Sequence, residues 1–157
     1  MDSSAQQKIL LIGVGNPLRG DDGAGPVVAK LIRERHHPCI SVREHDGEGA
    51  SLIETWASAQ KVIVVDAVSS DSPPGTIYRL DATEQPLPGK VFQSSTHAFG
   101  LHDAIELARA LHRLPRQIII YGIVGKCFET GSGLSGEVEI AARQVAERIL
   151  KETTGKA

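Results

Sequence analysis

Short apolar runs alternate along the chain with longer amphipathic segments. Three of the runs are nearly continuous and rich in β-branched residues, and each is only five to eight residues long. Such runs are typical of strands buried on both faces of a parallel sheet. The runs are Lys8–Val14, Lys61–Val65, which leads directly into Asp66, and Gln117–Val124.

Between these runs, apolar residues recur with the spacing of amphipathic helices. The helices are predicted over Gly23–Arg35, Ala50–Ala57, Leu101–Leu111 and Ser135–Lys151, and further strands over Ile40–Glu44 and Gly75–Leu80. Alternating strands and helices favour an α/β fold, here a three-layer α/β/α sandwich with a mostly parallel, twisted central sheet. We expect a single domain spanning 1–157, with its core over about 8–151.

Composition narrows the function classes. The net charge is −2 and the basic residues are scattered, so we expect no nucleic-acid partner and no binding to anionic membranes. The first apolar run is too short for a membrane span or a signal segment. The two cysteines, Cys39 and Cys127, have no CxxC spacing, which fits a reducing compartment. We therefore expect a soluble, cytoplasmic protein, and nothing indicates an obligate interface, so a monomer is expected.

Acidic and histidine side chains follow several predicted strands. Ligands of open α/β sheets bind beyond the carboxyl ends of the strands. The residues expected there are Asp21 and Asp22 after the first strand, His45 and Asp46 after the second, Asp66 at the end of the central strand, and His97 with His102 before the Leu101 helix. Carboxylates and imidazole together suit a divalent ion such as Ni²⁺ or Zn²⁺. Each of these residues alone is weak support for a metal site, since an Asp after a strand is more often a helix cap.

The glycine-rich turn after the first strand has a competing interpretation as a phosphate cradle. Its glycines, at Gly13, Gly15 and Gly20, lack the dinucleotide-binding spacing, and no Walker lysine follows. Two carboxylates at the helix start would also repel phosphate, by about 4 kcal/mol at an effective dielectric of 20. The pattern therefore favours a cation over a nucleotide.

Three motifs in this order resemble the maturation endopeptidases of [NiFe] hydrogenases. They read GVGNPLRGDDGAGP, VIVVDAV and STHAFGL, and the YGIVG strand and last helix extend the resemblance over nearly the whole chain. The resemblance implies an endopeptidase that removes a C-terminal extension from the hydrogenase large-subunit precursor after nickel insertion. It also implies that Asp22, Asp66 and His97 are metal ligands.

The family's turn with an Asp before glycine corresponds to Asp46, to which the resemblance gives a role in activity. Two positions depart from the family pattern. Asp22 stands where many members carry Glu, which shortens its reach by one methylene, and the turn reads Asp46-Gly47-Glu48-Gly49 instead of Asp-Gly-Gly-Thr. Glu48 could face solvent, contact the substrate or tune the metal.

The attacking group is left open by the sequence. A water made acidic by a bound ion could attack the scissile carbonyl. Alternatively, the three ligands recognise the precursor's nickel as a maturation tag, which is preferred because two oxygens and one nitrogen bind Ni²⁺ less tightly than several imidazoles or thiolates. Asp46 or Asp21 could act as the base, although a helix-cap role is preferred for Asp21. A nickel-binding chaperone that holds the precursor without cutting it is the alternative function.

Conventional protease motifs are absent from the sequence. There is no H-E-x-x-H zinc motif and no G-x-S-x-G elbow in a strand-to-helix context. Cys127 is interpreted as a half-buried small residue, not as a nucleophile. His102 is predicted to face solvent or cap its helix. The remaining histidines are predicted to lie at the surface: His36, His37, His45 and His112.

Overall fold

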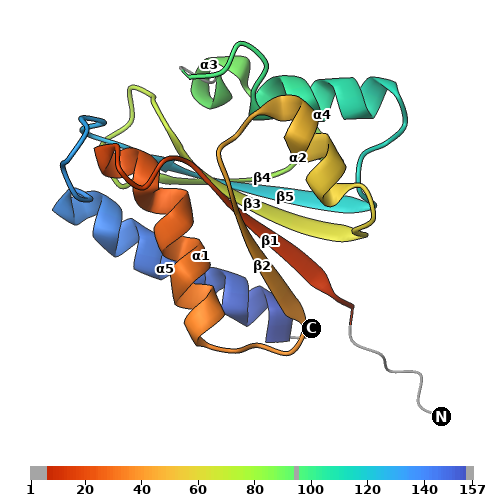
Figure 1. Ribbon diagram of the computed structural model, residues 1–157, viewed down its shortest axis with the longest axis horizontal. Coiled ribbons are helices and arrows are strands. Elements are labelled where there is room, and N and C mark those ends of the chain that lie inside the picture. The colour runs from red at the N-terminus through yellow and green to blue at the C-terminus, as the bar shows by residue number, and fades with distance from the viewer. Residues whose placement is uncertain (1–6, 94–95, 155–157) are drawn as a thin grey trace.

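A five-stranded sheet forms the centre of the computed structural model, which describes residues 7–93 and 96–154 (Figure 1). Its strand order is β2-β1-β3-β5-β4, and only the edge strand β4 runs antiparallel to its neighbour. The predicted domain limits of 1–157 extend beyond the described residues. The strands are β1 (Ile9–Val14), β2 (Ile40–His45), β3 (Lys61–Val68), β4 (Ile77–Asp81) and β5 (Gln117–Val124).

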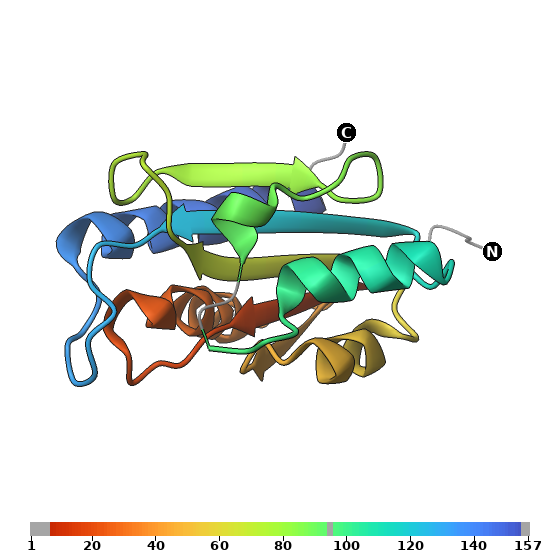
Figure 2. The same ribbon diagram turned by 90° about the horizontal axis from the view of Figure 1, so that it is seen from above.

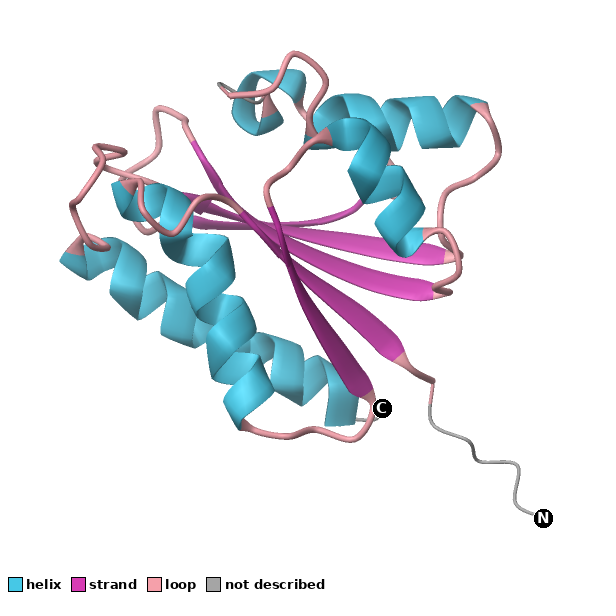
Figure 3. Cartoon of the chain, viewed as in Figure 1, coloured by secondary structure: helices cyan, strands magenta, loops and turns pink. Residues whose placement is uncertain are grey.

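Helices cover both faces of this sheet, as Figure 3 shows. The helices α1 and α5 pack on one face and α2, α3 and α4 on the other, each group with its own apolar core. In the view from above, the short helix α3 and the start of α4 lie over the sheet (Figure 2). The predicted three-layer, mostly parallel fold is thus confirmed. The helices are α1 (Ala24–Glu34), α2 (Gly49–Trp56), α3 (Gly89–Phe92), α4 (Leu101–Ala110) and α5 (Gly136–Thr154), with a 3-10 turn, η1 (Gly20–Gly23).

The apolar runs form strands because their side chains alternate between two cores. In β3, Val62 and Val64 enter the core under α2 and α4, whereas Ile63 and Val65 enter the core under α1 and α5. None of the helices in the described ranges is long and apolar enough to cross a membrane.

Among the differences from the sequence prediction, two concern elements that border the site. The strand β3 continues to Val68, which pairs with Val124, so Asp66 lies inside the strand and not at its end. The extension forms because β5 offers a pairing partner along its full length. Helix α3 was not predicted, since its single turn is too short to show a helical period.

Glycine at position 25 allows α1 to begin close to the sheet. A Cβ there would lie 2.4 Å from the Val14 carbonyl oxygen and 2.5 Å from that of Val65. No side chain fits at such distances, so this glycine brings the start of the helix against the end of β1 and against Val65 within β3. The acidic pair that precedes the helix is thereby placed at the carboxyl edge of the sheet.

A polar cluster fastens the edge strand β4 to α5. Arg79 donates to Glu152 from Nε and Nη2 at 3.1 and 3.0 Å, and the buried Tyr121 hydroxyl also donates to Glu152. Burial, with the adjacent carboxylate, raises the pKa of Tyr121 to about 12. Burial alone would raise the pKa of Glu152, but the bonds from Arg79 and Tyr121 hold it below its ordinary value of 4.5.

Acid is therefore expected to weaken this cluster. Because the folded pKa of Glu152 lies below its unfolded value of 4.5, its contribution is present above that value and is lost as pH falls through the folded pKa. Denaturant unfolding should show Glu152→Gln less stable than wild type by about 1 kcal/mol near neutral pH, with the gap closing in acid. The exposed Glu84→Gln is the control, and a gap that stays constant with pH would contradict the assignment.

Candidate active site

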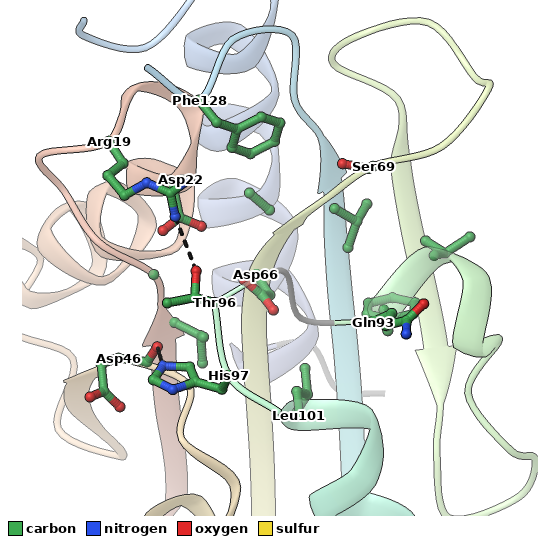
Figure 4. Close-up of a pocket in the computed structure, with 17 residues that line it drawn as sticks. Arg19, Asp22, Asp46, Asp66, Ser69, Gln93, Thr96, His97, Leu101 and Phe128 are labelled. Carbon is green, nitrogen blue, oxygen red and sulfur yellow. Dashed lines mark hydrogen bonds between the residues drawn. The ribbon is translucent and has the colours of Figure 1, made fainter. Parts of the chain in front are cut away.

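A cavity of about 170 Å³ opens at the carboxyl ends of β1, β2 and β3 (Figure 4). We call it the acidic cavity, because three carboxylates line it together with one imidazole and one guanidinium. These residues are Asp22, Asp46, Asp66, His97 and Arg19. The structure thus brings together the four residues that the sequence predicted for the site, from four separate segments of the chain.

Asp22 reaches the cavity from the turn η1. Its Oδ2 accepts a hydrogen bond of 2.8 Å from the backbone N–H of Asn16, which orients the half-buried carboxylate. The turn passes so close to β1 that a Cβ at Gly15 would lie 2.0 Å from the Asp22 carbonyl oxygen. Gly15 also has a φ of +140°, which disfavours other residues. Gly15 therefore shapes the turn that presents Asp22.

Asp66 enters the cavity from the central strand, where it pairs with Val14 on one side and Gly122 on the other. Burial raises the pKa of its carboxyl well above the ordinary value, and the neighbouring Asp22 carboxylate raises it further. Because the Asp22 carboxylate disfavours a charge on Asp66, a cation beside the two would be favourable.

His97 reaches the cavity from the segment before α4, with its ring directed toward Asp46 (Figure 4). Its Nε2 is 3.0 Å from the backbone carbonyl oxygen of Asp46. A carbonyl can only accept, so this bond requires the proton to be on Nε2. The ring is thus oriented by the turn after β2, in which Gly47 adopts a φ of +96°.

The Asp46 carboxylate lies at the rim of the cavity, with 72% of the side chain exposed. Its Oδ1 accepts a hydrogen bond of 3.0 Å from the backbone N–H of Glu48. Through its carbonyl, Asp46 also holds His97. The structure therefore places Asp46 where it can affect the site in two ways, and its catalytic role stays a prediction.

A metal-binding role for the three predicted ligands also stays a prediction. Within residues 7–93 and 96–154, no group of three or more His, Cys, Asp or Glu side chains is already arranged to hold a metal ion. Asp22, Asp66 and His97 nevertheless line one cavity. Their oxygen and nitrogen donors, and the repulsion between the two carboxylates, are chemically suited to a divalent cation.

Asp21, next to Asp22 in sequence, has a structural role instead. Its fully buried carboxylate accepts hydrogen bonds from the backbone N–H groups of Lys126, Cys127 and Ser135 and from the Ser135 hydroxyl, at 2.7 to 3.0 Å. Burial alone would raise the pKa of Asp21, but these bonds hold it below its ordinary value. The predicted helix-cap role is wrong, because neither η1 nor α1 has a side-chain cap. Asp21 fastens the loop between β5 and α5.

The turn after β2 explains Glu48. Its carboxylate accepts from the backbone N–H groups of Ala50 and Ser51, at 3.0 and 2.9 Å, and so caps the N-terminus of α2. These bonds lower the pKa of Glu48. The helix cap accounts for the contacts of Glu48 without a role in binding the substrate or tuning a metal.

His45 is not a surface residue, contrary to the prediction. Only 10% of its side chain is exposed. Its Nδ1 accepts from the Gly47 N–H at 2.9 Å, and its Nε2 lies 3.0 Å from the Ser51 hydroxyl oxygen. Burial lowers the pKa of His45. The His45 ring therefore stabilises the turn in which Asp46 lies, through its contacts with Gly47 and Ser51.

The other singled-out residues lie outside the acidic cavity. His102 is half-buried, with its Nδ1 3.7 Å from Asp103, and it borders a neighbouring hollow with His97. Cys127 is half-buried, as predicted, and His36 and His112 are exposed, also as predicted. His37, which was also predicted to lie at the surface, is half-buried instead, and its Nδ1 accepts the N–H of Cys39.

The structure also adds residues to the cavity that the sequence analysis did not single out, among them Arg19, Thr96 and Phe128. Arg19 and Thr96 lie inside the first and third motifs, so their positions were the available signal. Phe128 comes from the loop that Asp21 fastens, and no local pattern connects it with the site.

The fold and the cavity define an α/β protein with an acidic site at the carboxyl edge of its sheet. The model of one family, hydrogenase maturation protease, matches residues 27–152, and the chain belongs to this family. A protein of Methanocaldococcus jannaschii that is provisionally named as such a protease is 35% identical, over 94% of this chain and 97% of its own length. The hydrogenase 2 maturation protease of Escherichia coli is 29% identical, over 91% of this chain and 88% of its own.

Two solved structures share the fold. An endopeptidase from Escherichia coli superposes with a TM-score of 0.80 at 25% identity, over 96% of both chains. The [NiFe] hydrogenase maturation protease HybD from Thermococcus kodakarensis superposes with a TM-score of 0.72 at 26% identity, over 94% of this chain and all of the other. The family resemblance that the motifs predicted is confirmed.

Proposed function

We propose that this chain is an endopeptidase that removes the C-terminal extension of a [NiFe] hydrogenase large-subunit precursor after nickel has been inserted. Membership of the hydrogenase maturation protease family supports the protease activity and the type of substrate. The observation that carries the finer proposal is the acidic cavity, because its predicted ligands Asp22, Asp66 and His97 come from separate segments and face one space.

Nickel enters this proposal as part of the substrate. The Asp66 carboxyl has a raised pKa because it is buried next to Asp22, so the pair is complementary to an incoming positive charge. The donors of Asp22, Asp66 and His97 line one cavity, where an ion carried by the precursor could meet all three. Asp46, at the cavity rim, is the candidate to accept a proton during cleavage.

A cleavage assay tests the proposal. The purified chain is incubated with nickel-loaded precursor and, separately, with nickel-free precursor, and each product is weighed by mass spectrometry. We expect a mass loss at the C-terminus of the loaded precursor only. Binding of the loaded precursor without any cleavage would contradict the enzyme and support a nickel-binding chaperone. Equal cleavage of both precursors would contradict nickel recognition.

A further inference from the structure

Arg19 is the one lysine or arginine among the described residues that line the acidic cavity. It precedes the turn η1, three residues before Asp22, and its side chain is half-buried. Figure 4 shows Arg19 and Asp22 on the same side of the cavity, with the guanidinium extending toward Thr96. A positive group thus lies at a site that otherwise holds three carboxyl groups and one imidazole.

The guanidinium is held in place without being neutralised. Its Nη1 donates a hydrogen bond of 3.0 Å to the Thr96 hydroxyl, which bridges segments 77 residues apart. In the part of the chain that the structure describes, Arg19 forms no ion pair with a carboxylate, whereas other arginines do. A guanidinium has five N–H donors, so donors beyond this single neutral bond are available to a ligand.

Four backbone donors at the two turns beside the cavity are already used. The N–H of Gly15 donates to the His45 carbonyl at 2.9 Å, and that of Asn16 donates to Asp22. The N–H of Gly47 donates to the His45 ring, and that of Glu48 to Asp46. These four N–H groups are therefore not free to form a backbone oxyanion hole of the kind found in many acyl-transfer enzymes.

We propose that Arg19 is a catalytic residue that binds the oxygen of the scissile carbonyl and stabilises the negative charge that develops on it. This proposal rests on the endopeptidase function proposed above. A water oxygen bonds to the carbonyl carbon while the π pair moves onto the carbonyl oxygen. On collapse the C–N bond breaks, and both water protons end on the departing amine, leaving a carboxylate. A guanidinium beside that oxygen is a preorganised donor for the intermediate.

The competing explanation is that Arg19 only fastens the Thr96 segment, and with it His97. The two explanations predict different losses of activity when Arg19 and Thr96 are replaced in turn. If the positive charge acts on the substrate, Arg19→Ala should be far more damaging than Thr96→Val, which removes the bridge but keeps the guanidinium. If the bridge is what matters, both variants should lose activity equally.

The test measures kcat and KM for cleavage of the nickel-loaded precursor. For Arg19→Ala we expect kcat to fall by about 10²–10³-fold, with KM within about threefold of wild type. Thr96→Val should stay within about fivefold in kcat. Added guanidinium ion, at concentrations below those that unfold the chain, should restore at least about a tenth of the lost activity to Arg19→Ala. The exposed Arg116→Ala is the matched control and should behave like wild type.

Each contrary outcome is recognisable. Wild-type kcat in Arg19→Ala would overturn the role of Arg19 while leaving the endopeptidase intact. An equal loss in Thr96→Val, with no rescue by guanidinium, would overturn it in favour of the bridge. Absence of cleavage by wild type itself would refute the proposed function instead. Thermal unfolding midpoints of all variants identify any loss that comes from misfolding.

Discussion

Replacement of His97 by alanine is expected to abolish cleavage of the nickel-loaded precursor, with kcat/KM falling by more than about 10²-fold. The imidazole is the one nitrogen donor among the three predicted ligands, and the Asp46 carbonyl orients it at 3.0 Å. Its loss leaves only Asp22 and Asp66, and the Asp22 carboxylate disfavours a charge on Asp66. We therefore expect the variant to lose recognition of the nickel-bearing precursor.

The measurement is the mass of the precursor over time, together with circular dichroism and the thermal midpoint of the variant. His97 is half-buried and lies outside the apolar cores, so the circular dichroism spectrum and the thermal midpoint should match those of wild type. A control is His112→Asn at an exposed site, where asparagine tolerates the positive φ of 56°. Normal processing by His97→Ala would remove this residue from the site.

Much of the fold was predictable because its strands are buried on both faces. A run such as Gln117–Val124 has no polar face, and the structure places a strand over the same residues. The end of β3 was less predictable, since Asp66 interrupts the apolar run and suggests a boundary. Pairing with β5, which depends on tertiary structure, carries the strand on to Val68.

The candidate site was predictable as far as the carboxyl edge of the sheet could be located. Asp22, Asp66 and His97 follow from that edge together with the family resemblance, and they do line one cavity. The cavity's further members depend on contacts between distant segments. The bridge from Arg19 to Thr96 spans 77 residues, and no local pattern encodes it.

His45 and Glu48 also have hydrogen-bond partners that the sequence alone did not predict. His45 occupies the last position of an edge strand, where sequence favours exposure, yet Gly47 and Ser51 bond to both ring nitrogens. Glu48 departs from the family's turn, and its contacts show a helix cap. The identity of a polar residue predicts which bonds it can form, whereas the fold decides which partners it meets.

The adjacent acids Asp21 and Asp22 show how one dipeptide serves two purposes. Asp22 faces the acidic cavity, and Asp21 turns the other way, into the protein, toward partners 105 to 114 residues later. The loop that Asp21 fastens carries Phe128, which lines the same cavity. The buried acid therefore helps to shape the site without contacting substrate.

Replacement of Asp21 by asparagine is expected to lower the free energy of unfolding by about 3 kcal/mol. The amide keeps the shape of the carboxylate but loses its charge, and its NH₂ group faces donors where an acceptor is needed. Four donated hydrogen bonds, from Lys126, Cys127 and Ser135, are weakened or lost together. Because the carboxylate is fully buried, water cannot replace them.

Denaturant unfolding at neutral pH measures this loss, and the exposed Asp71→Asn is the matched control, expected within about 0.5 kcal/mol of wild type. A second readout separates Asp21 from a catalytic base. If Asp21 acts only through the loop, conditions that keep the variant folded should leave the pH profile of kcat unchanged in shape. An unaltered stability combined with a shifted pH profile would show instead that Asp21 exchanges protons with the substrate.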